Sequence, residues 1–336
     1  MRTFRSCATA VAIGAFTACA ALWTAPAPAT GQEQVPPIGG SEAGFAEIDR
    51  ETTRAIDDGV KWLATQQLGG SGRWASTPQR YQMSVTALAG LALLAHGDTP
   101  DSGKHAQNVR RAVEWVLDSQ KPAGTRWAGL LFDGRDDVFD QEDRPMHGHG
   151  FALLFLAEAY GQTREPLLRE RMHAAISLGA RLTERTITRD GGWFYTPDSP
   201  RDEGSVTITQ IQALRSAQNA GISVDVSVVD RAVEYIKQSQ DTATGGVKYT
   251  LRWGKTSCAL TSAGMSVLHG AGVYSGDAID KGFADIDWRT ATTHARELVN
   301  DRAIFTQEQT PDGIWVRTES SGRTSTSAFA DPLLHL

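Results

Sequence analysis

Cysteine is scarce in this sequence, since only Cys7, Cys19 and Cys258 occur among its 336 residues. Three cysteines cannot build a disulfide framework, so a hydrophobic core must stabilise the fold. Runs of basic residues are also missing, because 33 Lys and Arg stand against 39 Asp and Glu and give a net charge of −6. Phosphate binding requires clustered positive charge. We therefore expect no nucleic-acid partner.

Apolar runs long enough to cross a membrane are lacking too. The apolar run at residues 7–23 falls short of the ~20 residues that a membrane-spanning helix needs. Arg2 and Arg5 precede this run, and the small-residue segment Ala-Pro-Ala-Pro-Ala at 25–29 follows it. These features together are typical of a signal peptide. We predict that residues 1–29 are removed and that the mature chain is exported, to the periplasm or outside the cell, without an integral membrane domain.

Two alternatives would keep the chain at the membrane: an uncleaved signal that acts as an anchor, and lipidation at Cys19. Residues 30–48 contain Pro36-Pro37 and Gly39-Gly40, which predict a flexible leader. A single repeat domain is expected over residues 49–336. Processing leaves Cys258 as the lone thiol, which we interpret as a small buried residue rather than a nucleophile.

The rest of the chain repeats one unit. Each copy begins with an amphipathic helical pattern, as in GVKWLATQQLGGSGRW, then has a glycine-containing turn and a large aromatic residue. The five copies end at Trp74, Trp127, Trp193, Tyr249 and Trp315. A second helix follows each copy, and the first two of these are apolar on almost every side. The second helices begin near Ser84, Gly148, Ser205, Thr256 and Thr324.

One helix of each pair therefore has a solvent-exposed face, while the other must be buried on all sides. A double ring satisfies both, with amphipathic helices outside and apolar helices inside. We predict an all-α fold, an α/α toroid of about five helical hairpins whose last member is incomplete, because Pro332 interrupts it just before Leu336. A ring left open would expose apolar surface, so a second copy or a partner that closes it is expected.

The copies resemble the QW-type repeats of the prenyltransferase and squalene oxidase repeat group, which includes triterpene cyclases. The shared pattern is an aromatic–aliphatic pair, then Gln, then Gly and Trp. It is carried here by Trp62-Leu63 with Gln67 and Trp74, by Trp115-Val116 with Gln120 and Trp127, and by Tyr235-Ile236 with Gln240 and Tyr249. The third copy has Thr186 in place of Gln but keeps Gly191-Gly192-Trp193, and the fifth has Gln309, Asp312-Gly313 and Trp315. The resemblance implies that Gln ties the outer helix to the next segment and that these residues are structural.

The chemistry of that group is not carried by these residues. Triterpene cyclases protonate an alkene with a D-x-D-D cluster at the start of an inner helix, and no such cluster opens an inner helix here. Prenyltransferase β-subunits hold zinc with Asp, Cys and His, whereas Thr256 stands where the Asp would precede Cys258. We therefore expect no metal site and no cofactor.

A site is instead expected at one end of the ring, where all outer-to-inner connections must emerge. The longest connection, FDGRDDVFDQEDRPMHGHG, is rich in acidic residues. Carboxylates with imidazoles suit divalent-cation binding or acid–base work on a sugar. The alternative is a solvated acidic loop, with histidines that only pack. The candidate catalytic residues are Asp133, Asp136, Asp137, Asp140, His147 and His149.

Two classes of function follow. The first is an exported toroid that binds an apolar or extended ligand, or a glycan, in its central funnel without catalysis. The second is an enzyme, either a divergent squalene-type cyclase or a carbohydrate-active enzyme that uses the acidic rim. Carboxylates that converge on His147 and His149 would favour the enzyme, and dispersed charges would favour binding.

Overall fold

The computed structural model describes residues 50–76, 81–134, 139, 143–287, 305–309 and 315–319, the last two ranges as backbone. All of them except residue 50 belong to one compact unit, residues 51–336. The helices are α1 (Arg50–Thr65), α2 (Gln82–Ala95), α3 (Ala106–Asp118), α4 (Pro145–Gln162), α5 (Pro166–Thr186), α6 (Gly204–Asn219), α7 (Val226–Ser239) and α8 (Cys258–Gly270). Residues 277–287 are also helical.

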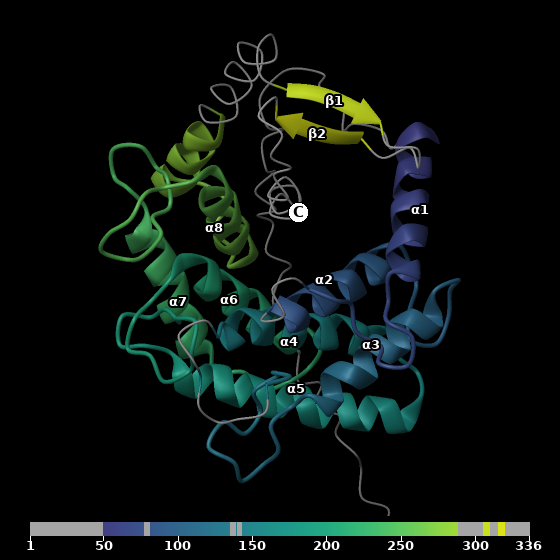
Figure 1. Ribbon diagram of the computed structural model, residues 1–336. Coiled ribbons are helices and arrows are strands. Elements are labelled where there is room, and N and C mark those ends of the chain that lie inside the picture. Colours follow the sequence, from purple (N-terminus) through teal and green to yellow (C-terminus); the bar gives the residue numbers. More distant parts are fainter. Residues whose placement is uncertain are drawn as a thin grey trace, which may run out of the picture. The chain divides into compact units, whose positions relative to one another are not determined.

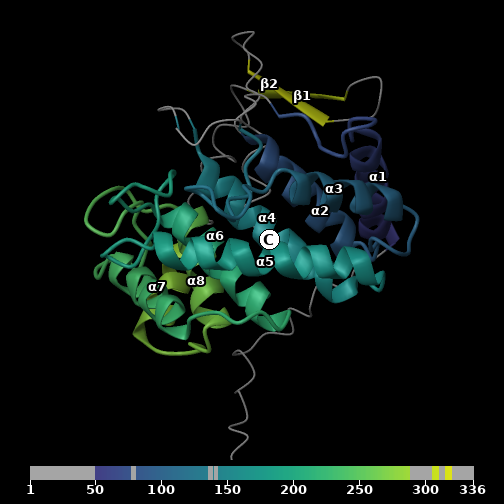
Figure 2. The same cartoon turned by 90° about the horizontal axis from the view of Figure 1, so that it is seen from below.

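The helices form two layers that alternate along the chain (Figure 1). Helix α4 packs between α2 and α6, and α6 packs in turn against α8, so these four are the inner helices. Helix α3 packs against α2 and α4, α5 against α4 and α6, and α7 against α6 and α8. The view from below shows the same succession (Figure 2). The prediction of an all-α toroid of helical hairpins is confirmed.

The inner helices are enclosed because their side chains leave little polar surface. On α4, Met146, Leu153, Phe155 and Leu156 have no solvent exposure. Close approach of the inner helices depends on small residues, since a Cβ added at Gly90 of α2 would lie 2.4 Å from the Phe155 ring. Burial of large apolar side chains contributes about 1.5–3 kcal/mol each, so the inner layer is the main source of stability.

Each outer helix ends in a connection that is fixed to the next outer helix. Gln67 donates two hydrogen bonds through Nε2, at 2.7 Å to the Gly72 carbonyl and at 2.9 Å to the Asn108 carbonyl of α3. Gln120 and Gln240 repeat this geometry. Their acceptors are the carbonyls of Gly129 and Ala175 for Gln120, and of Gly245 and Ala278 for Gln240.

The connections also share a hydrogen bond to the following inner helix. The amide of Trp74 donates to Thr86 Oγ1 at 3.1 Å, and the amide of Trp193 donates to Thr207 Oγ1 at 3.0 Å. In the other two described connections Leu131 and Val247 take the place of these tryptophans, because they pair with the repeat glutamines as Trp74 does. The expected aromatic ends, Trp127 and Tyr249, therefore lie outside this register. The pattern was read correctly as a repeat but aligned on the wrong residues in these two copies.

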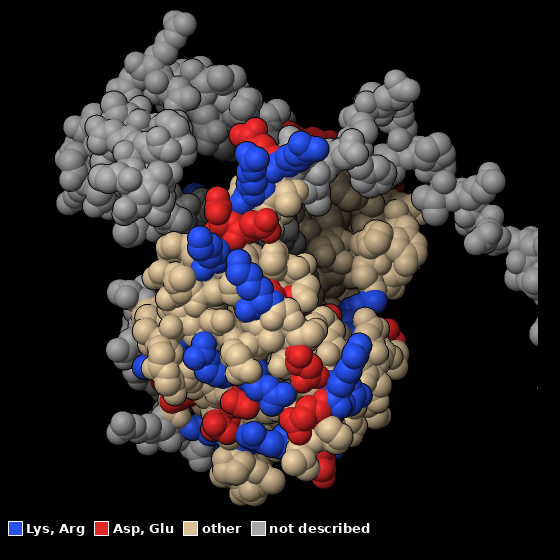
Figure 3. Space-filling view, turned by 90° about the vertical axis from the view of Figure 1, so that its right-hand side faces the viewer, with Lys and Arg blue, Asp and Glu red and all other residues tan. Residues whose placement is uncertain are grey.

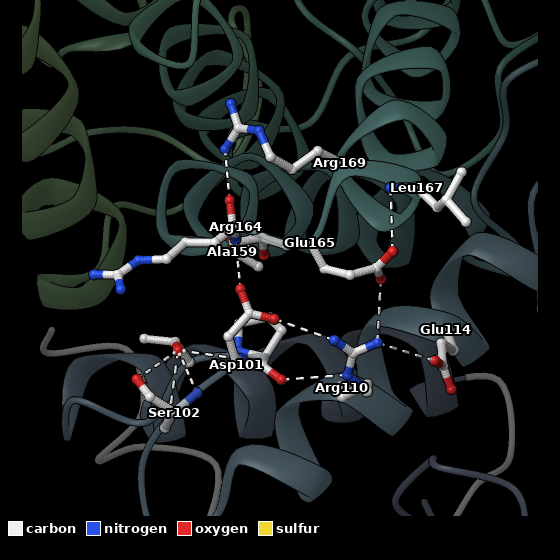
Figure 4. Close-up of polar contacts among 12 residues, drawn as sticks. Asp101, Ser102, Arg110, Glu114, Ala159, Arg164, Glu165, Leu167 and Arg169 are labelled. Atoms are coloured by element: carbon white, nitrogen blue, oxygen red, sulfur yellow. Dashed lines mark hydrogen bonds and ion pairs between the residues drawn. The ribbon is translucent and has the colours of Figure 1, made fainter.

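The opposite end of the helices is held by charged groups (Figure 4). Arg110 of α3 donates to Asp101 at 3.1 Å and to Glu165 at 3.4 Å. Glu165 also accepts from the Leu167 amide at 3.1 Å, and the Arg164 amide donates to Asp101. Acidic and basic side chains alternate over the face that carries α1 and α3 (Figure 3), so charge of one sign does not accumulate there.

A two-stranded hairpin was not expected from the sequence. Strand β1 (Phe305–Gln309) pairs antiparallel with β2 (Trp315–Glu319). The prediction of a fifth helix–turn–aromatic copy ending at Trp315 is wrong for these residues. The segment Pro311-Asp312-Gly313 between the two strands is a turn signal that the repeat alignment obscured. The expected last inner helix, residues 324–336, lies outside the described residues.

Candidate functional site

The inner helices enclose a cavity of about 660 Å³. Its wall is formed by one face of each of α4, α6 and α8, with Tyr249 from the connection between α7 and α8. This volume falls within the range of about 300–1,000 Å³ that is usual for small-molecule sites. The lining includes Phe151, Ile208, Leu260, Ala259 and Ala263, interspersed with the hydroxyl groups of Thr209, Ser257, Ser262 and Ser266.

An acidic side chain stands at the edge of this cavity. Glu203 precedes the first residue of α6 and is 99% buried, with a relative exposure of 1%. Burial raises the pKa of its carboxyl, whereas hydrogen bonds from the Val206 amide and the Ser205 hydroxyl lower it, and burial prevails. The carboxyl is therefore easier to protonate than an exposed glutamate. The Glu203 carboxylate also caps α6, since it accepts a hydrogen bond from the Val206 amide at 2.8 Å.

Glu203 is linked to a histidine through a serine. Ser205 Oγ donates to Glu203 at 2.7 Å, and His147 Nε2 lies 2.9 Å from Ser205 Oγ. Because Ser205 donates its proton to Glu203, it can accept from His147 only if Nε2 carries hydrogen. Protein atoms around the ring and the nearby Arg144 charge lower the pKa of His147 to about 4. His147 is therefore neutral at pH 7, with Nδ1 as its acceptor atom.

Two tyrosines complete the polar end of the cavity. Tyr249, which lines the cavity, shares a hydrogen bond between hydroxyls with Tyr195. The centroids of the Tyr195 and His147 rings are 5.7 Å apart. The Arg144 guanidinium lies 4.2 Å from the centroid of the Tyr195 ring. Burial raises the pKa of Tyr195, so its hydroxyl stays protonated and uncharged. Connections far apart in the sequence thus meet at one end of the helices, as expected.

His149 does not take part in this cluster. It has no solvent exposure, its Nδ1 accepts from the Leu131 amide at 3.1 Å, and its Nε2 lies 3.0 Å from Thr183 Oγ1. In the other described connections, the equivalent backbone amide donates to a threonine hydroxyl of the following inner helix. His149 takes the place of that threonine. Burial lowers the pKa of His149 to about 3. In the structure, His149 holds a connection against an inner helix.

Of the four acidic candidates, the described one, Asp133, does not line the large cavity. Asp133 lines a second, smaller cavity with Arg73, Gln82 and Trp115. Asp136, Asp137 and Asp140 lie outside the described residues. Of the six candidates, only His147 lines the large cavity among the residues that the structure describes.

The described part of the chain contains no group of three or more His, Cys, Asp or Glu side chains that could hold a metal ion. Cys258, the first residue of α8, is a free thiol of intermediate exposure, 4.0 Å from Ser262 Oγ. Over the same residues, no helix combines the length and the apolar character that a membrane crossing requires.

Solved structures with similar folds include three kinds of enzyme. Cellobiose 2-epimerase from Spirochaeta thermophila matches with a TM-score of 0.53 at 13% identity, over 83% of this chain and 75% of the epimerase. A type II terpene cyclase from Scytonema matches at 0.43 and 18% identity, over 81% of this chain and 66% of the cyclase. A polysaccharide lyase matches at 0.45 and 14% identity, over 74% of this chain and 70% of the lyase.

The epimerase match supports the assignment of this protein to the α/α toroids by its fold. No protein-family model and no curated protein matches the sequence. A fold of this class houses unrelated chemistries, so the site residues must carry the functional argument.

Sequence reasoning missed Glu203, Ser205 and Tyr249. One signal was present, because Glu203 and Ser205 flank the start of an inner helix, and inner-helix starts were expected to border the funnel. The search for clustered carboxylates drew attention to the longer acidic loop instead. The contact of His147 with Ser205 could not be read from residue spacing, since 58 positions separate the two residues.

Proposed function

We propose that this protein binds an apolar molecule with one polar end in the cavity between α4, α6 and α8. The observation that carries the proposal is the cavity itself, which combines apolar side chains with a polar cluster at one edge, formed by Glu203, Ser205, His147 and Tyr249. Burial of apolar ligand surface would provide most of the affinity, and the polar cluster would fix the ligand's orientation.

The polar end of the ligand is expected to bear a hydroxyl or carbonyl group. His147 is neutral at pH 7 and has an acceptor atom, Nδ1, while the raised pKa of Tyr195 keeps its hydroxyl protonated. A group that needs strong positive charge, such as a phosphate, finds no Lys or Arg among the described residues that line this cavity. An uncharged polar group suits the cluster better.

The proposal is tested by titrating the purified protein with farnesol in a calorimeter. Ala263→Trp would fill the cavity, so we expect its affinity for farnesol to fall at least tenfold. Val226→Trp is the matched control, because Val226 is 54% exposed on α7 and does not line the cavity. Absence of farnesol binding by the wild type, or equal binding by both variants, would contradict this function.

A second candidate function is acid-assisted chemistry on the bound molecule. It is favoured by the raised pKa of Glu203, whose carboxyl lines the cavity and is linked to His147 through Ser205. A raised pKa makes a carboxyl easier to protonate, which suits a general acid. Incubation with squalene or farnesol, followed by product analysis, would detect turnover, and Glu203→Gln should abolish it. Turnover that persists in Glu203→Gln would exclude this role.

We further propose that the chain is an exported member of the prenyltransferase and squalene oxidase repeat group. The recurring hydrogen bonds from Gln67, Gln120 and Gln240 support this membership, because that group is expected to use its repeat glutamines in this way. The pattern of residues 1–29 supports export through a signal peptide.

A further inference from the structure

A second cavity of about 320 Å³ lies away from the funnel, at the end of the helices where the connections emerge. Arg73 reaches it from the connection between α1 and α2, and Asp133 from the connection between α3 and α4. Gln82, the first residue of α2, and Trp115 of α3 complete the described lining. Four residues from separate segments therefore meet around one small space.

The backbone holds these residues in place. The Arg73 carbonyl accepts from the Leu68 amide at 2.9 Å, and the adjacent Trp74 amide is bound to Thr86. The Phe132 amide, next to Asp133, donates to the Ser119 carbonyl at 3.4 Å. The side chains thus project from anchored backbone, which favours a site that is formed before a ligand arrives.

The amide of Gln82 indicates that this cavity receives a ligand. Gln82 has a relative exposure of only 8%, and the described residues provide no hydrogen bond to its side chain. Buried polar side chains are nearly always hydrogen-bonded, and an unsatisfied one costs about 1–3 kcal/mol. A polar molecule that enters the cavity would satisfy this amide.

The chemistry of the lining selects the ligand. Arg73 supplies donors, the Asp133 carboxylate supplies acceptors, and the Gln82 amide supplies both. Asp133 is exposed as a whole residue, yet burial of its carboxyl raises the pKa of that group, against the opposing charges of Arg73 and Lys121. Hydroxyl groups act as donor and acceptor at once, so a polyol matches this mixture better than an anion or a cation does. The Trp115 ring adds a flat apolar surface.

We propose that this second cavity binds one hexopyranose ring, with hydroxyls on Arg73, Gln82 and Asp133 and one apolar face of the sugar against Trp115. A cavity of this size, at the lower end of small-molecule sites, accommodates a single ring rather than a chain of sugars. This site is separate from the funnel cavity and does not depend on the function proposed there.

Saturation-transfer NMR with the methyl glycosides of glucose, galactose and mannose tests this site. The wild type should transfer saturation to the ring protons of at least one glycoside. Gln82→Leu keeps the side-chain size but removes the amide, and we expect it to weaken binding about tenfold, as for one lost hydrogen bond. Asp133→Asn should weaken binding as well.

Val226→Trp is the control, since Val226 is exposed on α7 and lines neither cavity, so this variant should bind the glycoside as the wild type does. Circular dichroism would confirm that each variant is folded. The proposal is overturned if no methyl glycoside binds the wild type at millimolar concentration, or if folded Gln82→Leu and Asp133→Asn bind unchanged. Binding of oligosaccharides without binding of any methyl glycoside would also overturn a one-ring site.

Discussion

At the scale of single residues, two neighbouring histidines have opposite roles although only one residue separates them. His147 lines the funnel cavity and contacts Ser205, whereas His149 accepts a backbone hydrogen bond inside the protein. Positions two apart on a helix point to different sides, about 200° apart at ~100° per residue, so a shared role was improbable on geometry alone. The sequence placed both histidines in one candidate group, whereas only His147 of the two lines the large cavity.

Replacement of His149 tests its structural role. Three other inner helices place a threonine at the equivalent position, namely Thr86, Thr207 and Thr261. We expect His149→Leu to lower the free energy of unfolding by about 1–3 kcal/mol, because the Leu131 amide loses its acceptor inside the protein. His149→Thr should cost less, since it retains an acceptor. Urea unfolding at pH 7.5 measures both, and equal losses would contradict the assigned role.

The same residue predicts how stability depends on pH. An unfolded histidine takes up a proton near pH 6.5, but burial lowers the pKa of His149 to about 3 and of His147 to about 4 in the folded protein. The unfolded state therefore binds more protons between these values, so stability is full above pH 6.5 and falls as the pH decreases toward 4. His149→Thr should reduce the loss of unfolding free energy between pH 7.5 and 5. An unchanged loss would show that His149 does not titrate in this way.

At the scale of elements, four glycines fix the distance between each connection and the next outer helix. Gly72, Gly129, Gly191 and Gly245 all have positive φ and lie against a backbone carbonyl of that helix. At Gly129, where φ is 97°, an added Cβ would lie 2.3 Å from the Leu178 carbonyl oxygen. No side chain fits there without moving α5 away.

Gly129→Ala should consequently be far more damaging than Gly124→Ala. Gly124 has a similar φ of 88° but nothing within 4 Å of an added Cβ, so it isolates the cost of backbone strain, about 1–2 kcal/mol. Gly129→Ala adds a steric clash to that strain and should exceed it by about 2 kcal/mol or more. Chemical unfolding of the two variants makes the comparison. Equal losses would mean that the connection has room to shift.

The helices were predictable because their signals are local. The amphipathic pattern of the outer helices and the nearly uniform apolar character of α2 and α4 determine which layer each joins. The site was less predictable because it depends on contacts between connections, such as Tyr195 with Tyr249. The repeat register failed where Leu131 and Val247 replace an aromatic residue, since packing at that position needs apolar bulk rather than an indole.

At the scale of the whole molecule, large apolar side chains are exposed on α1 and near residue 283. They bear on the prediction that another chain closes the ring. Ile56 and Trp62 on α1 are 44% and 55% exposed, and Tyr274 and Phe283 are 64% and 53% exposed. Surfaces of this kind are commonly covered by another chain. A second copy or a partner that completes the ring stays a prediction.

Export of the chain can be tested on the full-length protein. When it is expressed in a bacterium, we expect the exported form to begin at residue 30, because residues 1–29 carry the signal-peptide pattern. Intact-mass analysis of the exported fraction measures this directly. A mass that retains residues 1–29 would indicate an uncleaved anchor. A chain that begins at Cys19 with added acyl groups would indicate lipidation.

The hydrogen bonds of the repeat glutamines all run toward later parts of the sequence. Gln67, Gln120 and Gln240 each reach a carbonyl that is made later in synthesis, in the following outer helix. During synthesis, each of these hairpins therefore lacks one of its hydrogen-bond acceptors until the next outer helix has been made. Deletion of hairpins from the carboxyl end should destabilise the last remaining hairpin, because its glutamine loses the acceptor in the next outer helix. Deletion from the amino end should leave the glutamine hydrogen bonds of the later hairpins intact.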